Sequence, residues 1–589
     1  MFWINVLVAR GVCFGKSLMP KLINQRGAVY ALAATVLFAY QQVASAADGG
    51  KKNVSTKVSA TVANRKVRPG TRAAGAVATK TAVAGTAIRT NSLASPPLAF
   101  PSEEAKVRHL LNRVTYGPST EDLDRVMSIG IDKYIDEQLK PESITLPAKV
   151  AALAKQPALS ESPARLFLNY GKEAFDDMAK AARKTGPDGK GTDAAVKKEI
   201  QQLVRDNYQD LYGQVSEARL TRATDSPRQL EEVMTEFWFN HFNVSMDKGL
   251  DHLWVGSYEE AAIRPNVFGK FRELLGATAH HAAMLFYLDN WQNTAPKLVV
   301  KPKGANKKFA GLNENYAREL MELHTLGVDG GYTQKDVVEL ARVLTGHGLI
   351  TKKSIITNPA GLNSKYGYNF DQSRHDFGDK VLLGQTIKAK GVEELEEALD
   401  MLAKHPSTAK FVSYKLAQYF ICDDPPPTLV TKLSNTFQKT DGDLKVMMRT
   451  LLKSDEFWDA RQANAKFKSP YRYLVSGLRA SNATVNNTRP LLGFLRLQGM
   501  PMYQCQTPDG YKNTQKAWLS SSGLLQRINF ATAFGANRSP GARISDVSPE
   551  QVMRIAGIKP TDQTGQVVES SPRQLKLALL FGSPEFMKY

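Results

Sequence analysis

The feature that most constrains this chain is a succession of amphipathic helical segments with marked ends, which fills the sequence after residue 100. Ser119 and Asp122 form a capping-box pattern, and Gly130 ends the predicted helix about three turns later. Convincing runs of alternating apolar and polar residues are missing from the sequence. The pattern therefore predicts an all-α, multi-helix body with long loops, and it argues against doubly wound and sandwich folds.

Further helices are predicted along the rest of the chain, with ends marked by capping residues, prolines and glycines. One helix opens at Ser226-Pro227, and the others cover 132–139, 313–327, 333–346, 392–404, 406–421, 428–437, 443–453 and 515–534. Polar breaks rich in Gly, Pro and Asn lie at 184–193, 294–312 and 353–375. The last two breaks are long enough to be functional loops or surface insertions.

The first 46 residues have the order of a secretory signal peptide. Lys21 and Arg26 precede an apolar run over 28–40, and Ala44-Ser45-Ala46 supplies small residues for cleavage after Ala46. The run is shorter than the roughly 20 residues that a spanning helix needs, and an uncleaved anchor is the alternative. Met19 is an alternative start. We therefore expect a periplasmic or secreted protein with no transmembrane span in the mature chain.

Residues 47–100 are rich in Ala, Thr, Val, Gly and Ser, and they carry nine basic residues and one acidic residue. This composition predicts a disordered, low-complexity linker. Of the net charge of +20, the signal segment holds +4 and the linker +8, which leaves +8 on residues 101–589. The basicity is therefore not a property of the helical domain at 101–589, and no nucleic-acid partner is expected. An exported basic linker is either a solvated tether or a contact for anionic envelope polymers and lipid headgroups.

The cysteine count limits the protein class. Three cysteines in 589 residues exclude a disulfide-dense scaffold, an iron–sulfur protein and a zinc ribbon. Cys422 and Cys505 remain after cleavage of the signal segment. They are either one disulfide bridge or two independent buried thiols.

Several strings, in one order along the chain, carry a family resemblance. They are HLLNRVTYGP at 109–118, FWFNHF at 237–242, NENYARELMELHTLG at 313–327 with GYT at 331–333, HDFG at 375–378 with LG at 383–384, and the segment 511–530. Together they resemble the bacterial family named domain of unknown function 1800, over residues 101–589. The resemblance implies an exported, largely helical protein, often encoded beside a second exported family, numbered 1501, which is the expected partner. It implies no catalytic residue, because no activity is established for the family.

The helix predicted over 313–327 has a charged face that admits three interpretations. The first is a surface ladder of ion pairs, worth about 0.3 kcal/mol each. The second is a catalytic one, in which Glu319 and Glu322 face a cleft as acid/base groups or metal ligands and Arg318 orients them. The third is a buried ion-pair network between two subdomains.

A divalent metal site would have to combine side chains from separate segments. His241 and His324 lie on the apolar stripes of two predicted helices, each five residues after a glutamate. Five residues turn a regular helix by roughly 140°, so neither glutamate shares a metal with its histidine. His375 and Asp376, from a loop, would complete the set with His241 and His324. The alternative is that these histidines are hydrogen-bonded core residues.

The absence of several catalytic and binding motifs narrows the range of possible functions. The sequence has no Gly-x-Ser-x-Gly, His-Glu-x-x-His, Cys-x-x-Cys or Gly-x-x-x-x-Gly-Lys-Ser/Thr string in its mature part. Standard α/β-hydrolases, zinc peptidases, redox carriers and nucleotide hydrolases are therefore disfavoured. We expect a binding or assembly protein of the cell envelope. The alternative is a metal-dependent or acid/base hydrolase that acts on an extracellular polymer or ester.

Overall fold

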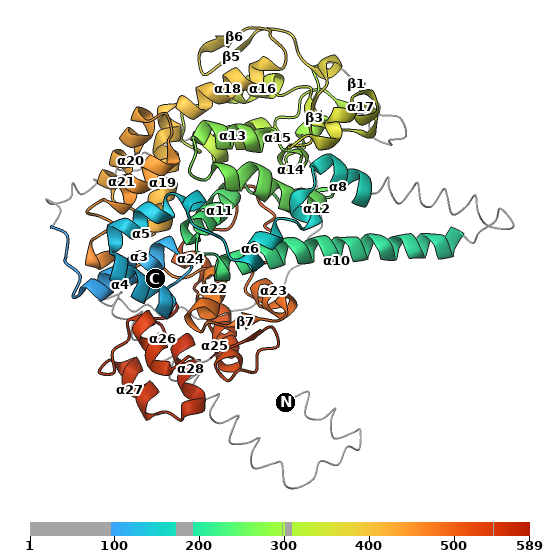
Figure 1. The fold of residues 1–589 in the computed structure, drawn as a ribbon. Helices are drawn as coiled ribbons and strands as arrows, with labels where there is room; N and C mark the ends of the chain where they lie inside the picture. The colour runs from blue at the N-terminus through green and yellow to red at the C-terminus, as the bar shows by residue number, and fades with distance from the viewer. Residues whose placement is uncertain (1–95, 172–192, 297–298, 301–308, 546) are drawn as a thin grey trace, which may run out of the picture. The chain divides into compact units, whose positions relative to one another are not determined.

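Helices follow one another through the computed structural model, which describes residues 96–171, 193–296, 299–300, 309–545 and 547–589 (Figure 1). The all-α prediction is confirmed. Strands in the described residues occur only as two-stranded antiparallel ribbons. Residues 97–589 form one compact unit. The predicted signal peptide, the predicted linker up to residue 95 and almost all of the predicted break at 184–193 lie outside the described residues.

In the first half of the described chain, helical segments lie between Glu103 and Thr325. They are α3 (Glu103–Val114), α4 (Thr120–Ile129), α5 (Ile131–Gln138), η1 (Pro141–Ser143), α6 (Ala148–Leu153), α7 (Pro157–Ser160), α8 (Pro163–Tyr170), α10 (Asp193–Asp225), α11 (Gln229–His241), α12 (Asp251–Tyr258), η2 (Glu259–Ile263), η3 (Arg264–Asn266), α13 (Phe271–Ala279), α14 (Ala282–Tyr287), η4 (Asn290–Gln292), α15 (Asn315–Glu319) and η5 (Leu320–Thr325).

The helices of the second half continue to the last residues. They are α16 (Gln334–Val343), α17 (Lys352–Thr357), η6 (Pro359–Asn363), η7 (Gln372–Arg374), α18 (Glu393–Lys404), α19 (Pro406–Phe420), α20 (Pro427–Lys439), α21 (Leu444–Leu452), η8 (Ala460–Gln462), α22 (Pro470–Ala480), α23 (Thr488–Leu497), α24 (Gln515–Trp518), α25 (Ser521–Gly535), α26 (Pro549–Ala556), α27 (Gln563–Ser570) and α28 (Arg573–Phe581).

The ribbons are short and pair strands that are near in sequence, apart from the last. They are β1 (Val299–Val300) with β2 (Phe309–Ala310), β3 (His347–Leu349) with β4 (Tyr368–Phe370), β5 (Lys380–Leu382) with β6 (Gln385–Ile387), and β7 (Thr484–Val485) with β8 (Ala542–Arg543).

Capping chemistry sets the helix ends that the sequence predicts. Ser119 and Asp122 form a complete capping box at the start of α4, and Thr333 and Asp336 form another at the start of α16. The predicted helix at 515–534 is wrong as one element, because Ser520 caps a new helix there by accepting from the backbone N–H of Gly523 at 3.1 Å. The predicted break at 353–375 also contains ordered structure, namely α17, η6, β4 and η7.

The core is built around α11, which is buried on almost every side. Ten of its apolar and polar side chains besides His241 are buried, among them Leu230, Val233 and Trp238. A helix that is buried all round belongs to the centre of a large protein, and α11 contacts η2, α10, α3 and α5. The residues of α11 are therefore positioned by packing on several neighbours at once.

Two helices change from α to π geometry without a break. In one, α12 continues into η2; in the other, α15 continues into η5, the segment that the sequence predicts as a single regular helix. The backbone N–H of Leu326 donates to the carbonyl of Met321 at 2.8 Å, an i→i+5 bond. Such π segments occur mostly as single turns and often at functional sites.

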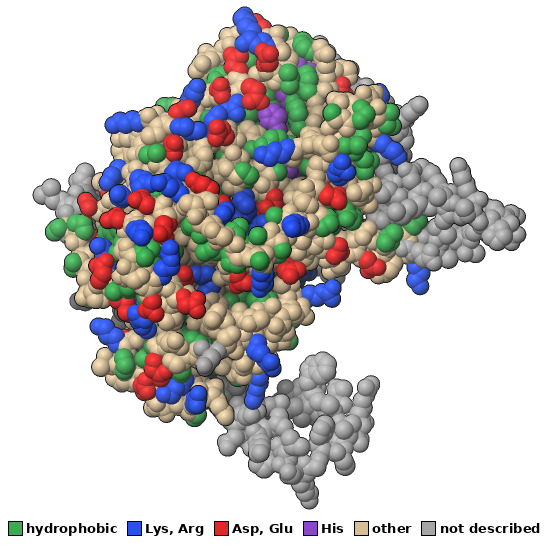
Figure 2. Space-filling model, viewed as in Figure 1, with side chains coloured by type: hydrophobic (Ala, Val, Ile, Leu, Met, Phe, Trp, Pro, Cys, Tyr) green, Lys and Arg blue, Asp and Glu red, His purple; other side chains and the backbone are tan. Residues whose placement is uncertain are grey.

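Positive and negative side chains are intermixed on the surface rather than clustered in patches of one sign. Lysine and arginine side chains alternate with aspartate and glutamate over the face drawn in Figure 2. Among the described residues, no helix is long and apolar enough to cross a membrane.

Candidate functional site

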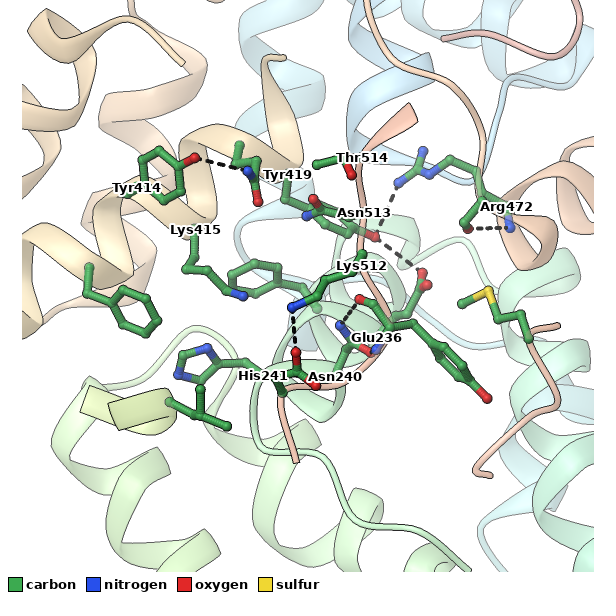
Figure 3. Close-up of a pocket in the computed structure, with 18 of the residues that line it drawn as sticks. Glu236, Asn240, His241, Tyr414, Lys415, Tyr419, Arg472, Lys512, Asn513 and Thr514 are labelled. Carbon is green, nitrogen blue, oxygen red and sulfur yellow. Dashed lines mark hydrogen bonds and ion pairs between the residues drawn. The ribbon is translucent and has the colours of Figure 1, made fainter. Parts of the chain in front are cut away.

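A pocket of about 510 Å³ lies where α11, η5, α19 and α22 meet a loop over residues 500–514 (Figure 3). Its aromatic lining is Phe237, Phe411, Tyr414, Tyr419, Phe467, Tyr511 and Tyr589. Its charged lining is Glu236, Glu322, Asp509, Lys415, Arg472 and Lys512. Ligand pockets combine apolar walls with a few placed polar groups, and this lining has both.

The floor of the pocket carries a buried carboxylate. Glu236, on α11, accepts a hydrogen bond from the Tyr419 hydroxyl at 3.2 Å. The Arg472 guanidinium donates to the same hydroxyl at 3.4 Å and to the carbonyls of Asn112 and Thr115 at 2.9 and 2.7 Å. Burial and the Glu236 charge raise the pKa of Tyr419 well above its ordinary value, so its hydroxyl keeps its proton. The tyrosine is therefore the donor of this pair, and one oxygen of Glu236 is the acceptor.

The loop that covers one side of the pocket is fixed to α11 by a reciprocal pair of bonds. The Asn240 amide donates to the carbonyl of Tyr511 at 2.7 Å and accepts from its backbone N–H at 2.7 Å. The preceding Gly510 has φ +67°, and a Cβ there would collide with the Asn240 backbone and side chain. A glycine is thus required for the loop to come this close to α11.

A second anchor holds the loop on its other side. Lys466 is buried and donates to Asp423 at 2.6 Å and to the carbonyl of Asn513 at 3.0 Å. Asp423 also accepts from the backbone N–H of Gln515 at 2.6 Å. The 511–515 segment is therefore tied to the end of α19 as well as to α11.

Two cations in the lining differ in their surroundings. Lys512 forms an ion pair with Asp509, whose pKa it lowers although burial acts in the opposite direction. Lys415, on α19, has no hydrogen bond or ion pair within the described part of the chain, and its Nζ lies 5.9 Å from the centre of the Phe411 ring. Burial and the Lys512 charge lower the pKa of Lys415. A cation without a partner in a pocket wall marks a functional-site candidate.

His241 enters the lining as a neutral ring. Its Nε2 lies 3.0 Å from the carbonyl oxygen of His324. Because a carbonyl only accepts, Nε2 carries the proton and Nδ1 keeps a lone pair. Burial, followed by the charge of Lys415, lowers the pKa of His241 well below its ordinary value.

A small inner chamber of about 40 Å³ adjoins the pocket. Glu236, Asn240, Met500 and Tyr511 line both spaces, and Arg219, Tyr471, Tyr503 and Cys505 line the inner one only. The chamber exceeds the roughly 10–15 Å³ that one water molecule needs. Glu236 therefore lines two adjoining spaces.

Of the three predicted catalytic residues, Glu322 lines the pocket, whereas Glu319 and Arg318 do not. Glu322 lines the pocket and accepts from the Tyr332 hydroxyl at 3.1 Å. Glu319 is half-buried, and burial together with the Glu322 charge raises its pKa. Arg318 instead donates to Glu314 at 3.2 Å and to Gln334 at 2.9 Å. Arg318 is therefore engaged away from Glu322.

The four predicted metal ligands fall into two places. His241 and His324 are neighbours, with ring centres 6.3 Å apart. His375 lies 3.2 Å from Glu394, which also pairs with Lys380, and all three side chains are fully buried. Asp376 accepts from Arg342 at 2.9 and 3.1 Å, and neither it nor His375 lines the pocket. Among the described residues, no group of three or more His, Cys, Asp and Glu side chains is arranged to hold a metal ion.

Cys422 and Cys505 are free thiols in the structure. Cys422 donates to the carbonyl of Asp424 at 3.2 Å, and Cys505 lies 3.8 Å from the carbonyl of Thr507. Each thiol therefore has its own local acceptor, as in the alternative of two independent thiols.

Several lining residues carry no motif that would identify them from sequence. Lys415 sits within an ordinary amphipathic helix, and Arg472 follows a proline in a helix that is buried throughout. Asp509 and Lys512 belong to a loop without periodicity. Among the residues that were not predicted, Glu236 had one signal, a charged residue directly before the aromatic run Phe237–Phe239.

One comparison with known proteins identifies the family of the chain. A family model described as "Protein of unknown function (DUF1800)" matches residues 109–588. No curated protein and no solved structure shows significant similarity to the chain. The match covers most of the sequence and includes the elements that line the pocket. The chain therefore belongs to the DUF1800 family of proteins of unknown function.

Proposed function

We propose that the chain is an exported binding protein of the cell envelope whose pocket takes a neutral glycan segment. The basic, apolar and small-residue order of the first 46 residues supports export. Glycans are among the polymers of a cell envelope. The proposal therefore joins the N-terminal pattern to the chemistry of the pocket.

The observation that carries the proposal is the lining of the pocket. Seven aromatic side chains face a space that also holds three acidic and three basic side chains. A sugar ring offers a C–H face that packs on an aromatic ring and hydroxyls that bond to carboxylates and amides. Equal numbers of acidic and basic side chains favour a ligand without net charge.

Calorimetric titration of the purified mature chain with an N-acetylglucosamine trimer tests the proposal. Tyr414 is 38% exposed and lines the pocket, so Tyr414→Ala should weaken binding about tenfold, whereas Tyr414→Phe keeps the ring and the affinity. Phe377→Ala, which removes a ring that is 48% exposed outside the pocket, is the matched control. Absence of heat with wild-type protein, or equal loss in both alanine variants, contradicts the proposal.

An acid/base hydrolase of the same ligand is the second candidate, and Glu236 favours it. Its carboxylate faces both the pocket and the inner chamber, and the Tyr419 bond leaves one oxygen without a partner among the described residues. Such a carboxylate can take a proton from water. Turnover of the trimer by the wild type that Glu236→Gln abolishes would make this the function.

Two expectations from the sequence stay predictions. Elemental analysis of protein purified without chelator or histidine tag tests for a divalent metal. Co-purification from the native envelope tests for a partner of the family numbered 1501.

A further inference from the structure

Lys415 brings a primary amine into the pocket without a partner in the described part of the chain. The other five charged side chains of the lining are all engaged: Lys512 with Asp509, Glu236 with Tyr419, Glu322 with Tyr332, and Arg472 with two carbonyls and a hydroxyl. Lys415 is thus the one charged lining residue, among those described, that has no hydrogen bond or ion pair. Figure 3 shows it on α19 with its amine directed toward the space between α19 and α11.

The surroundings of Lys415 favour the free amine. Its aliphatic stem is half-buried beside Phe411, and the Lys512 ammonium lies close enough to oppose a second positive charge. Burial and this neighbour lower its pKa, so a larger share is unprotonated at neutral pH than for an ordinary lysine. The charge of Asp509 acts in the opposite direction but is outweighed, and the Phe411 ring, whose centre lies 5.9 Å from Nζ, attracts the ammonium form weakly; His241, in the same wall, is neutral.

We propose that Lys415 Nζ is the nucleophile of this pocket and forms an imine with the open-chain aldehyde at the reducing end of a glycan. The proposal rests on the glycan-binding function and names the part of the ligand that reacts. Desolvated lysines beside a second cation are activated in this way toward carbonyl compounds.

The chemistry balances without an oxidant or a reductant. The Nζ lone pair forms a bond to the carbonyl carbon, the C–O π bond opens, and one proton moves from nitrogen to oxygen to give a neutral carbinolamine. The hydroxyl then takes a second proton and leaves as water while the nitrogen lone pair forms the C=N bond. Loss of the last N–H proton gives the imine. Protons exchange with solvent, since the rim residue Val328 is 66% exposed and the pocket is open there. Addition of water reverses the reaction.

Reductive trapping tests the proposal. The full mature chain is incubated with glycolaldehyde and cyanoborohydride, which reduces an imine to a stable amine, and labelled lysines are identified by peptide mass spectrometry. Lys410, exposed on the same helix, is the internal control. At neutral pH we expect Lys415 to be labelled ahead of Lys410, with the difference shrinking as the pH rises past the ordinary lysine value of 10.5. Equal rates at neutral pH would overturn the proposal.

The variant Lys415→Arg identifies the reacting lysine. Arginine keeps a cation on a long stem but does not form the imine, so the preferred label should be lost while labelling of Lys410 is unchanged. An excess of the trimer reduced to its alditol, which has no aldehyde, should protect Lys415 in the wild type. If Lys415 is labelled preferentially but the alditol does not protect it, the glycan is not the ligand, although the lysine still forms an imine. If the trimer binds but Lys415 is not labelled preferentially, only the imine proposal is overturned. A thermal unfolding curve confirms that Lys415→Arg is folded.

Discussion

Tyr419 donates its hydroxyl hydrogen to Glu236 at 3.2 Å and so joins α19 to α11 across the floor of the pocket. Both side chains are buried, and the charge of Glu236 is therefore balanced by a hydrogen bond and by Arg472 behind the tyrosine rather than by direct contact with a cation. A buried carboxylate that has lost its donor costs free energy.

Tyr419→Phe should therefore lower the free energy of unfolding by about 1–3 kcal/mol, because Glu236 is left with an unmet acceptor. Urea unfolding measures the change. Tyr414→Phe is the matched control, since its hydroxyl is near the surface and bonds only to Gln418 among the described residues. Equal effects of the two substitutions would contradict a special role for the Tyr419 bond.

Arg264 holds three carboxylates together beside the π-helix η2. It pairs with Glu232 at 2.8 Å, Glu259 at 3.3 Å and Glu260 at 3.2 Å, and its side chain is 13% exposed. Arg264→Met should cost about 3–5 kcal/mol of stability, because the buried Glu232 loses its only ion-pair partner among the described residues, although Glu259 keeps Arg219 and Glu260 keeps Arg222.

The control for Arg264 is a surface pair. Arg125 forms an ion pair with Glu137, and the two side chains are 49% and 27% exposed. Arg125→Met removes this pair and should change the free energy of unfolding by less than about 1 kcal/mol. Denaturant unfolding of both variants gives the comparison. A loss for Arg264→Met no larger than the surface value would rule out the buried network as a stabilising element.

Acid should destabilise the fold through its buried histidines. Burial lowers the pKa of His109, His281, His324 and His347 to about 3 each. The unfolded chain binds these protons near pH 6.5 and the folded chain only near 3, so stability is complete above 6.5 and falls as the pH drops through this window. We expect the loss to be visible as a decreasing free energy of unfolding across that range.

His324→Phe isolates one of these groups. The ring fits among its aromatic neighbours Phe242 and Tyr316, and it removes an Nε2 that is buried without a partner among the described residues. The variant should lose stability less steeply with acid, by up to about 1.4 kcal/mol per pH unit. A slope identical to that of the wild type would contradict the titration of His324.

Gly510→Ala should impair ligand binding more than a comparable substitution elsewhere. Gly510 and Gly499 both have positive φ, +67° and +76°, so alanine strains both backbones. Only at Gly510 does the added Cβ meet another part of the chain, the Asn240 backbone and amide that fix the loop over the pocket. Calorimetry should therefore show lost trimer binding for Gly510→Ala and near wild-type binding for Gly499→Ala; the reverse order would contradict this account of the loop.

The two thiols should react independently. Alkylation of denatured protein without reductant should label both Cys422 and Cys505, which are free in the structure. In native protein Cys422 should react first, because Cys505 is 6% exposed. Peptide mass spectrometry reads both results, and a missing label on the denatured chain would reveal a bridge.

The helical body and many helix ends could be predicted because their causes are local. At the start of α4 the Ser119 hydroxyl accepts from the backbone N–H of Asp122, and the Asp122 carboxylate accepts from the backbone N–H of Ser119, so the cap depends only on residues within one turn. The long helix α10 was missed because its apolar residues do not form one stripe. Its register depends on contacts with α12 and α22, which sequence spacing does not encode.

The pocket could be predicted only in part, since its members come from segments far apart in the chain. His241 and Glu322 were identified from helical patterns and line the pocket, whereas Lys415 and Arg472 looked like ordinary helix residues. Their roles follow from what surrounds them, a missing partner in one case and two carbonyls with a tyrosine in the other. Tertiary contacts of this kind produce no periodic pattern in the sequence.

The π geometry of η5 makes this segment sensitive to length rather than to composition alone. Its i→i+5 bonding accommodates one residue more per turn than an α-helix, so Leu320–Thr325 holds a residue that a regular helix would have no place for. Deleting a single residue here would restore α bonding and leave the turns on either side with the same faces, because a π turn covers the same rotation as an α turn with about one residue more. Only side chains inside the segment would change place, and Glu322, which lines the pocket, is one of them. The length of this segment therefore shapes the pocket wall as much as its residue types do. An alignment with a gap inside the segment would compare proteins whose pocket walls differ.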